Sequence, residues 1–258
     1  MTTEKLPLSV AIITKDEEER LPECLASVSF ADEVVVVDSG STDRTVAIAR
    51  AFGAEVSVEE WQGFGCQKQL AIDRCRHDWV LVLDADERVA PEAQAEIAEV
   101  LATGLCVAYS FPRKNYFSGR WLKHAGWWPD RVVRLFRKDS ARMSPRSVHE
   151  GLEVHGPVGE LQHPLIHYAN QSLTQTLNKV NHYSSAGATE LFAQGKTASA
   201  TKALLRAAWS FFYSYILRGG FLDRGEGFIM AVSDFMNVFF KYAKLRELRK
   251  QKEKDTLS

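Results

Sequence analysis

The sequence predicts an α/β fold in which a mostly parallel sheet is followed by a helical C-terminal extension. Three observations predict this fold. Strand-like and helix-like segments alternate up to residue 111, several apolar runs are unbroken as in strands buried on both faces, and the chain after about residue 172 has only helical spacing. With 258 residues, of which 45% are hydrophobic, the chain is long enough for one sizeable core and an appendage.

Strands and helices are expected to alternate along the first part of the chain. We expect strands at residues 8–13, 33–37, 55–58, 79–83, 107–111 and 132–136, and helices at residues 17–28, 42–52, 67–75 and 91–101. Ser41 or Thr42 is the expected N-cap of the second helix, and Pro91 suits the first turn of the fourth. This rhythm favours parallel strands joined by right-handed crossovers.

The composition argues against several classes of protein. A net charge of -1 gives no global case for nucleic-acid binding. No uncharged apolar stretch reaches the roughly 20 residues of a spanning helix, and the first residues lack the basic-then-apolar pattern of an export signal. The four cysteines have no metal-binding spacing, which indicates reduced thiols in a cytoplasmic protein.

Acidic side chains follow three of the predicted parallel strands. Asp84 and Asp86 come directly after the central apolar run, Asp38 ends the second strand, and Glu17 follows the first strand shortly after Thr14. Ligands of open α/β sheets bind outside the carboxyl ends of the strands, and paired carboxylates hold Mg²⁺ or Mn²⁺ against phosphate oxygens. The sequence therefore predicts a site for a phosphorylated small molecule and a divalent metal.

Two further features fit a nucleotide as that small molecule. The Asp38 carboxylate precedes a glycine turn, where helix capping does not need it, and it is suited to accept a hydrogen bond from the ring N–H of a pyrimidine base. The glycines at 63 and 65 allow a close approach of the backbone, and Lys68 would place a positive charge near a diphosphate. A solvated Lys68 is the alternative.

Taken as an ordered set, these residues resemble the family-2 glycosyltransferases of the GT-A fold. The set consists of Thr14-x-x-Glu17, Asp38-x-x-Ser41-x-Asp43, Gly63 to Lys68 and Asp84-x-Asp86. Four later stretches are similar to a subgroup that contains bacterial lipopolysaccharide core β-1,4-glucosyltransferases: Trp127 to Asp130, Arg134 to Arg137, Val148 to Glu150 and Gly220 to Asp223.

The resemblance implies a metal-dependent, inverting transfer of a hexose, with glucose expected, from a UDP-sugar to an inner-core sugar of lipopolysaccharide. It implies that Thr14, Glu17 and Asp38 line the uridine pocket and that Lys68 lies near the diphosphate. Asp84 would face the ribose or the metal, and Asp86 would ligate Mg²⁺ or Mn²⁺. Asp16 departs from the family, because many relatives carry Asn at that position.

A catalytic base is required because the acceptor hydroxyl is a poor nucleophile until its proton is removed. Glu150 is the predicted base and Asp130 is the competing candidate, since neither the Glu-Asp pair nor the Gln-x-x-Arg-Trp motif of the family is evident. His149 is expected either to orient Glu150 or to complete the metal shell with Asp84 and Asp86. A structural role is the alternative for His149.

Four arginines surround this region and suit an anionic acceptor. Arg131, Arg134, Arg137 and Arg146 are expected either to recognise phosphate or carboxylate groups, as the inner core of lipopolysaccharide would offer, or to be solvated.

The predicted organisation has three parts: a nucleotide-sugar-binding half at 1–112, an acceptor and catalytic half at 113–170, and an amphipathic helical extension at 171–258. The extension carries wide apolar faces, followed by seven Lys or Arg against two Glu between residues 241 and 254. This combination predicts peripheral attachment to an anionic membrane surface, at the cytoplasmic face of the bacterial inner membrane. Packing within the chain or against a second copy is the alternative.

Three other functions compete with this prediction. A polyprenyl-phosphate glycosyltransferase would use a lipid phosphate as acceptor, but that group often has spanning helices near its C-terminus. A haloacid-dehalogenase-like phosphatase also carries strand-Asp-x-Asp, but usually on its first strand and with Thr or Val where Arg88 stands. A nucleotide-sugar-binding module without catalysis would not need the intact pair of Asp84 and Asp86.

Overall fold

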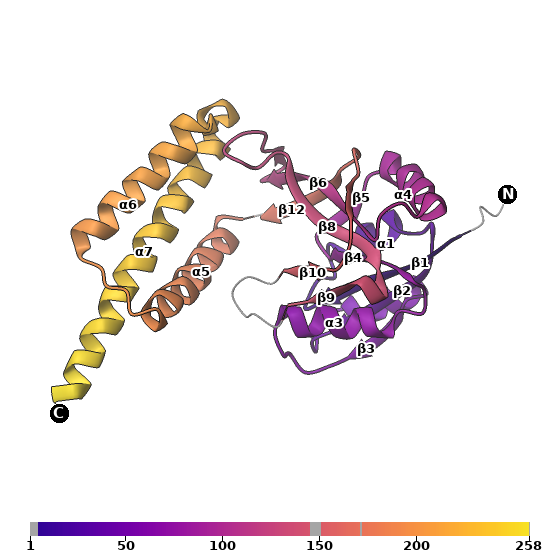
Figure 1. Ribbon diagram of the computed structural model, residues 1–258, viewed down its shortest axis with the longest axis horizontal. Coiled ribbons are helices and arrows are strands. Elements are labelled where there is room, and N and C mark those ends of the chain that lie inside the picture. The colour runs from indigo at the N-terminus through magenta and orange to yellow at the C-terminus, as the bar shows by residue number, and fades with distance from the viewer. Residues whose placement is uncertain (1–4, 145–150, 171, 258) are drawn as a thin grey trace. The chain divides into compact units, whose positions relative to one another are not determined.

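The computed structural model describes residues 5–144, 151–170 and 172–257, which form two compact units (Figure 1). The first unit comprises Met1–Lys114 and Asp130–His167, and the second comprises Asn115–Pro129 and Tyr168–Ser258. Residues 115–129 thus pack with the C-terminal helices, although they lie between two segments of the first unit in the sequence.

Most of the strands lie wholly or partly in the first unit. Its opening strands are β1 (Leu6–Thr14), β2 (Ala31–Asp38), β3 (Glu55–Val58) and β4 (Trp79–Asp84). They are followed by β5 (Glu87–Val89), β6 (Ala108–Phe117), β8 (Asp130–Arg137), β9 (Ala141–Met143), β10 (Leu152–Val154), β11 (Val158–Glu160) and β12 (Leu165–Asn170). The connecting helices are α1 (Leu21–Ser27), α2 (Thr45–Ala51), α3 (Phe64–Arg74) and α4 (Pro91–Thr103).

The sheet joins a parallel half to a half in which strand directions are mixed. Its strand order is β3-β2-β1-β4-β8-β6-β12-β5. β1 pairs in parallel with β2 and β4, whereas β8 pairs antiparallel with both β4 and β6. The predicted parallel sheet is therefore confirmed for the first four strands, and antiparallel pairing extends it beyond β4.

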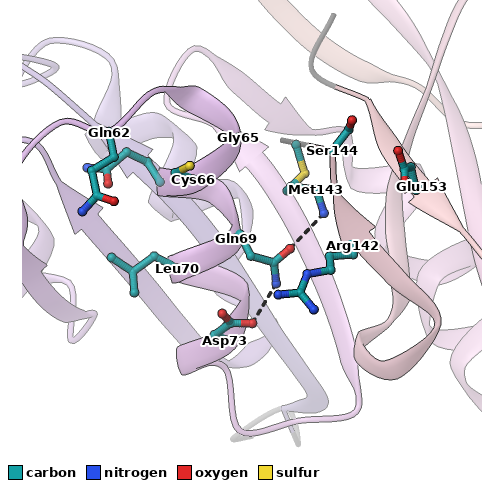
Figure 2. A pocket seen from close by; sticks show the side chains of 11 residues that line it. Gln62, Gly65, Cys66, Gln69, Leu70, Asp73, Arg142, Met143, Ser144 and Glu153 are labelled. Carbon is teal, nitrogen blue, oxygen red and sulfur yellow. Dashed lines mark hydrogen bonds between the residues drawn. The ribbon is translucent and has the colours of Figure 1, made fainter. Parts of the chain in front are cut away.

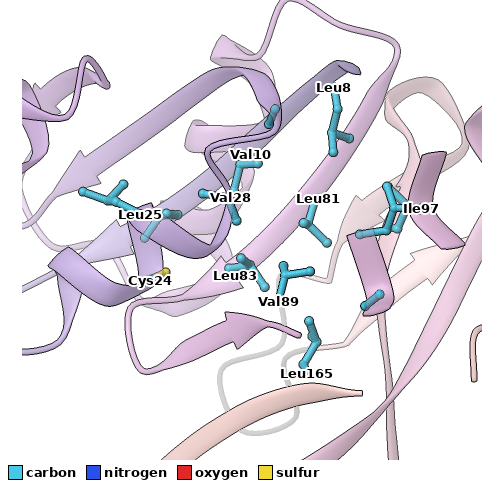
Figure 3. Packing of buried hydrophobic residues seen from close by; sticks show 14 of the residues in the cluster. Leu8, Val10, Cys24, Leu25, Val28, Leu81, Leu83, Val89, Ile97 and Leu165 are labelled. Carbon is cyan, nitrogen blue, oxygen red and sulfur yellow. The ribbon is translucent and has the colours of Figure 1, made fainter. Parts of the chain in front are cut away.

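Apolar side chains cover both faces of β4. Leu81 and Leu83 pack on one face with residues of α1 and α4 (Figure 3), whereas Val80 and Val82 pack on the other face with residues of α3. All four side chains are at most 4% exposed. The unbroken apolar run is thus a strand buried on both faces, because successive side chains of a strand point to opposite sides of the sheet.

The second unit is built from α5 (Leu173–Ala193), α6 (Ala200–Phe212) and α7 (Arg224–Leu257), with the short strand β7 (Arg120–Trp121). A π-helical turn (Tyr213–Leu217) and a 3₁₀ turn (Gly220–Asp223) join α6 to α7. No helix within the described residues is both long and apolar enough to cross a membrane.

Asp223 and Gly227 hold the second unit together at the start of α7. The Asp223 carboxylate accepts hydrogen bonds from the backbone N–H of Lys123 at 3.0 Å and of His124 at 2.8 Å. A Cβ at Gly227 would lie 1.9 Å from the carbonyl oxygen of Gly220, so only glycine allows this close approach. The stretch 220–223 therefore has a packing role.

The predicted start of α2 is wrong. The helix begins at Thr45, and neither Ser41 nor Thr42 caps it. Both residues bind neighbouring acids instead: the Ser41 hydroxyl donates to Asp38, and the backbone N–H of Thr42 donates to Asp16. Both groups are used within the loop, because the Asp38 carboxylate at the end of β2 lies beside Ser41 and the Asp16 carboxylate reaches Thr42 from the loop after β1.

Other boundaries also differ from the prediction. The helix expected at residues 17–28 is shortened to α1, because turns occupy residues 15–20. The strands β5, β7, β9, β10, β11 and β12 were not predicted, since segments of two to six residues carry too little periodicity.

Candidate active site

The acidic side chains predicted to share one edge of the sheet do so. Thr14 lies opposite Asp38 in the pairing of β1 with β2, and Ile13 lies opposite Asp84 in the pairing of β1 with β4. Asp84 is the last residue of β4, and Asp86 follows two positions later. Three loops therefore meet where open α/β sheets bind their ligands.

Asp38 organises the loop that follows β2. Its Oδ1 accepts hydrogen bonds from the N–H groups of Gly40 at 2.9 Å and Ser41 at 2.7 Å, and its Oδ2 accepts from the hydroxyls of Thr14 at 2.8 Å and Ser41 at 2.5 Å. The side chain is fully buried. These four bonds fix the shape of the loop, and a contact between Asp38 and a base stays a prediction.

Asp16 and Glu17 lie in the loop that follows β1. Asp16 has a left-handed φ of 53°, and its Oδ1 accepts the N–H of Thr42 at 2.7 Å, which ties this loop to the next one. Burial raises the pKa of Glu17 to about 7, with Arg20 opposing the rise and the charge of Asp86 reinforcing it. Glu17 is therefore partly protonated at neutral pH.

Asp84 is held between two basic side chains. Its Oδ1 lies 2.6 Å from Nζ of Lys68, and its Oδ2 accepts a hydrogen bond from Nη2 of Arg134 at 2.6 Å. Burial opposes ionisation, but the charges of Arg134 and Lys68 outweigh it and hold the pKa of Asp84 well below its usual range. Lys68 is therefore paired, and the alternative of a solvated Lys68 is wrong.

A chain of buried charges continues from Asp84 to Asp130. The fully buried Glu87 accepts hydrogen bonds from Arg134 at 2.8 Å and from Arg113 at 3.3 Å. Arg113 in turn donates from Nε and Nη2 to Oδ2 of Asp130, at 3.0 Å and 2.6 Å. Sequence reasoning missed Glu87 and Arg113, because neither belongs to a motif and 26 residues separate them.

Asp86 and His167 form a pair that suits a divalent cation. Oδ2 of Asp86 lies 3.6 Å from Nε2 of His167 on β12. The described residues contain no group of three or more His, Cys, Asp or Glu that would hold a metal by themselves. Magnesium in nucleotide sites needs only one or two carboxylates besides phosphate oxygens, so this pair fits a metal that is shared with a phosphorylated ligand.

His149, Glu150 and Arg146 lie outside the described residues. Ser144 and Gly151 flank that segment, and the N–H of Ser144 donates to the carbonyl of Gly151 at 2.8 Å. The predicted roles of Glu150 as base and of His149 as metal ligand therefore stay predictions.

Two cavities adjoin these residues in the first unit. One of about 370 Å³ is lined by Lys68, Arg113 and Arg134 together with apolar residues, and no acidic residue is among the described ones that line it. The other, of about 460 Å³, lies at α3 and β9, where Gln69 accepts the backbone N–H of Met143 (Figure 2). The first cavity, with three basic side chains, is the candidate site for an anion.

Comparison with known proteins identifies the family. Residues 9–151, more than half of the chain, match the family described as Glycosyl transferase family 2. The chain belongs to glycosyl transferase family 2. It is 34% identical over 254 residues to an uncharacterized glycosyltransferase of Rickettsia typhi, covering 93% of this chain and 87% of the relative. It is 31% identical over 254 residues to LpsC, a lipopolysaccharide core biosynthesis glycosyltransferase of Rhizobium meliloti, covering 93% of this chain and 92% of LpsC.

Solved structures are more distant from this family-2 glycosyltransferase. TarS of S. aureus is 16% identical, with a TM-score of 0.46 over 95% of this chain and 92% of that one. Glucosyl-3-phosphoglycerate synthase from Mycobacterium tuberculosis, solved with Mn²⁺ and UDP, is 26% identical, with a TM-score of 0.35 over 43% of each chain. Family membership confirms the predicted fold class and a transferase activity, and it excludes the phosphatase alternative.

The three arginines of β8 do not form a single cluster that could bind an anionic acceptor together. Arg134 joins the chain of buried charges, whereas Arg131 donates to the carbonyl of Leu161 at 3.1 Å. The guanidinium of Arg137 lies 5.0 Å from the ring centre of Trp79. Their different partners follow from their positions along one strand, so only Arg134 of these three lines the positively charged cavity.

Proposed function

We propose that this chain transfers a hexose, with glucose expected, from a UDP-sugar to an inner-core sugar of lipopolysaccharide, with inversion at the anomeric carbon. The shared edge of the sheet carries the proposal, because Asp38 ends β2 there, Asp84 ends β4, and Asp86 follows β4. The name of the relative LpsC supports lipopolysaccharide core as the acceptor class.

Asp86 would hold the Mg²⁺ or Mn²⁺ ion, with His167 or His149 as a further ligand. The pairing of Asp86 with His167 at 3.6 Å supports this assignment. When bound, the cation neutralises the negative charge that grows on the leaving diphosphate. Asp84 is already neutralised by Lys68 and Arg134, so it would face the ribose or the edge of the metal site.

Lys68 and Arg134 would contact the diphosphate from the positively charged cavity. Nε of Arg134 is buried and has no hydrogen-bond partner among the described residues. A buried donor without an acceptor costs about 1–3 kcal/mol, and a phosphate oxygen would remove that cost. The uridine side of the site would be formed by Thr14, Glu17 and Asp38, at or just after the ends of β1 and β2.

Glu150 would remove the proton from the acceptor hydroxyl. The competing candidate, Asp130, receives two of the hydrogen bonds that Arg113 donates, both on one oxygen. That arrangement suits a residue that fixes β6 to β8, and it supports Glu150 as the base. Asp130 would then act as a positioning residue.

The enzyme would work at the cytoplasmic face of the bacterial inner membrane, attached peripherally to an anionic surface. The acceptor belongs to an amphiphile that resides in a membrane. Exposed apolar side chains of α6, together with basic residues of the second unit, support such attachment.

Transfer from radiolabelled UDP-glucose in the presence of Mn²⁺ tests the proposed reaction. We expect label in purified lipopolysaccharide core acceptor and none in polyprenyl phosphate. Glu150→Gln should lower kcat by roughly 100-fold or more, with a smaller loss for Asp130→Asn. Label in polyprenyl phosphate alone would overturn the acceptor assignment, and binding of UDP-sugars without any transfer would favour a module that lacks catalysis.

A further inference from the structure

A groove of about 510 Å³ runs between α6 and α7, which lie side by side in the second unit (Figure 1). Leu205, Trp209 and Tyr213 line it from one side, and Val238 and Tyr242 line it from α7. Its walls are therefore mostly apolar and aromatic, although it opens on the surface. No part of the proposed reaction uses this groove.

Two basic side chains reach the groove without an acidic partner among the described residues. The guanidinium of Arg206 lies 5.6 Å from the ring centre of Tyr242, and Nζ of Lys241 lies 5.7 Å from the same ring. The described part of the chain supplies neither with an ion pair, and none of the described lining residues is acidic. The groove thus offers two uncompensated positive charges beside an apolar wall.

Gly187 of α5 helps to position one of these charges. A Cβ at Gly187 would lie 2.7 Å from Cδ of Lys241, so the lysine stem lies directly along α5. Long basic side chains commonly bury their stems on apolar surface and present the charge to a polar layer. The ammonium of Lys241 and the guanidinium of Arg206 thus each lie beside the ring of Tyr242, which lines the groove with them.

An exposed apolar row borders the groove. Leu205, Trp209, Phe212 and Ile216 follow helical spacing and are 65%, 60%, 44% and 44% exposed. Further exposed apolar residues continue the row into the turns before α7. Single exposed apolar residues are normal, but a contiguous row of this length is typical of a surface that an apolar partner covers.

We propose that the groove between α6 and α7 binds the phosphate group of an anionic phospholipid. Arg206 and Lys241 contact the phosphate, while Leu205 and Trp209 lie among the acyl chains. Tryptophan and tyrosine favour this interfacial depth because each has an apolar body and a polar end. The inference rests on the membrane attachment in the proposed function and names the site that performs it.

The basic end of α7 is a poorer candidate for this contact. Lys244 donates to the side chain of Asn181 at 2.8 Å, and Arg249 donates to backbone carbonyls at the end of α5. These charges fasten α7 to α5. Arg246 and Lys250 are exposed nearby and provide a matched pair of charges for a control.

Sedimentation of the full chain with vesicles tests the proposal. The vesicles contain either phosphatidylcholine alone or phosphatidylcholine with about a third phosphatidylglycerol, and only the second kind should bind strongly. The double variant Arg206→Gln with Lys241→Gln should weaken that binding about 30-fold, because each lost charge weakens it about fivefold and the two effects multiply. Arg246→Gln with Lys250→Gln should change it by less than about fivefold.

A second variant tests the apolar contact independently. Leu205→Gln alters an exposed side chain, so the fold is retained, and it should weaken vesicle binding about tenfold or more. Equal losses for the two charge pairs, or equal binding to both kinds of vesicle, would overturn the proposal. A dimer that forms without lipid and is lost in Leu205→Gln would also overturn it, because the groove would then join two copies of the chain.

The test separates this inference from the proposed reaction. UDP binding and transfer to a soluble core oligosaccharide should remain at wild-type level in all three variants. Loss of vesicle binding with intact transfer supports the lipid site, whereas wild-type vesicle binding without any transfer by the parent chain would contradict the proposed reaction alone.

Discussion

Arg134 joins Asp84 to Glu87: its Nη2 lies 2.6 Å from Oδ2 of Asp84 and 2.8 Å from Oε1 of Glu87. Replacing Arg134 by Gln removes the counter-charge that both carboxylates share and, among the described residues, leaves Asp84 with Lys68 alone and Glu87 with Arg113 alone. Breaking a buried ion pair from one side costs about 3–5 kcal/mol, and we expect that loss in the free energy of unfolding by urea.

Arg137→Gln is the matched control, because Arg137 ends the same strand and lies over Trp79 at 5.0 Å without joining the buried charges. Its loss should not exceed about 1 kcal/mol. Equal losses for the two variants would mean that the buried charges contribute no more than a surface contact.

Asp38→Asn should destabilise the protein, because an amide nitrogen cannot accept the hydrogen bonds that end on one carboxylate oxygen. We expect a loss of about 2–4 kcal/mol in the free energy of unfolding. Asp32→Asn alters an exposed residue near the start of the same strand and should cost clearly less, since solvent screens its contact with Arg76. An unchanged Tm for Asp38→Asn would show that this carboxylate is kept for ligand binding alone.

Glu17 makes stability depend on pH. Its pKa is about 7 in the fold against 4.5 for the free group, so between these values the native state holds a proton that the unfolded chain releases. The free energy of unfolding therefore falls as pH rises through this window, and the whole of this loss is present above about pH 7. Glu17→Gln removes the cost and should gain about 1–3 kcal/mol over wild type at about pH 8.

The comparison at about pH 4 provides the control for Glu17, because both states of the wild type are then protonated. Wild type and Glu17→Gln should have similar unfolding free energies there. If the unfolding free energies of wild type and Glu17→Gln differed by the same amount at every pH, the effect of the substitution would come from packing and not from ionisation.

Gly227→Ala should unfold or strongly destabilise the second unit, because the new Cβ would lie 1.9 Å from a backbone oxygen of Gly220. A loss of at least about 3 kcal/mol is expected, since backbone cannot move aside as a flexible side chain does. Gly225→Ala, in the same helix, has nothing within 4 Å of its Cβ and should be neutral or stabilising by up to about 1 kcal/mol. Circular dichroism during thermal unfolding measures both, and a tolerated Gly227→Ala would disprove the close approach.

The parallel half of the sheet could be predicted because its information is local. Each apolar run is contiguous, and Asp38 and Asp84 stand directly at the ends of two such runs. Their position at a shared edge of the sheet could therefore be predicted from the sequence alone. The family resemblance rested on the same residues. Both predictions are confirmed, by the strand register and by the family match.

The chain of buried charges could not be predicted in that way. Glu87, Arg113 and Asp130 meet through strand pairings that connect distant segments. The structural role of Asp38 was also hidden: its sequence position suggested a ligand contact, whereas the structure gives its carboxylate three hydrogen bonds within its own loop and one from Thr14 of the neighbouring strand β1. Contacts between distant segments, such as the bond from Thr14, depend on tertiary pairing and leave no periodic trace.

The central claim is that carboxylates at neighbouring strand ends hold a nucleoside diphosphate through a divalent cation. Isothermal titration of UDP into the full chain with saturating Mn²⁺ tests it most directly. We predict heat of binding for the wild type and for Asp78→Ala, at the opposite end of β4, and none for Asp86→Ala or without metal. Equal heats with and without Mn²⁺, or undiminished heat for Asp86→Ala, would contradict the account.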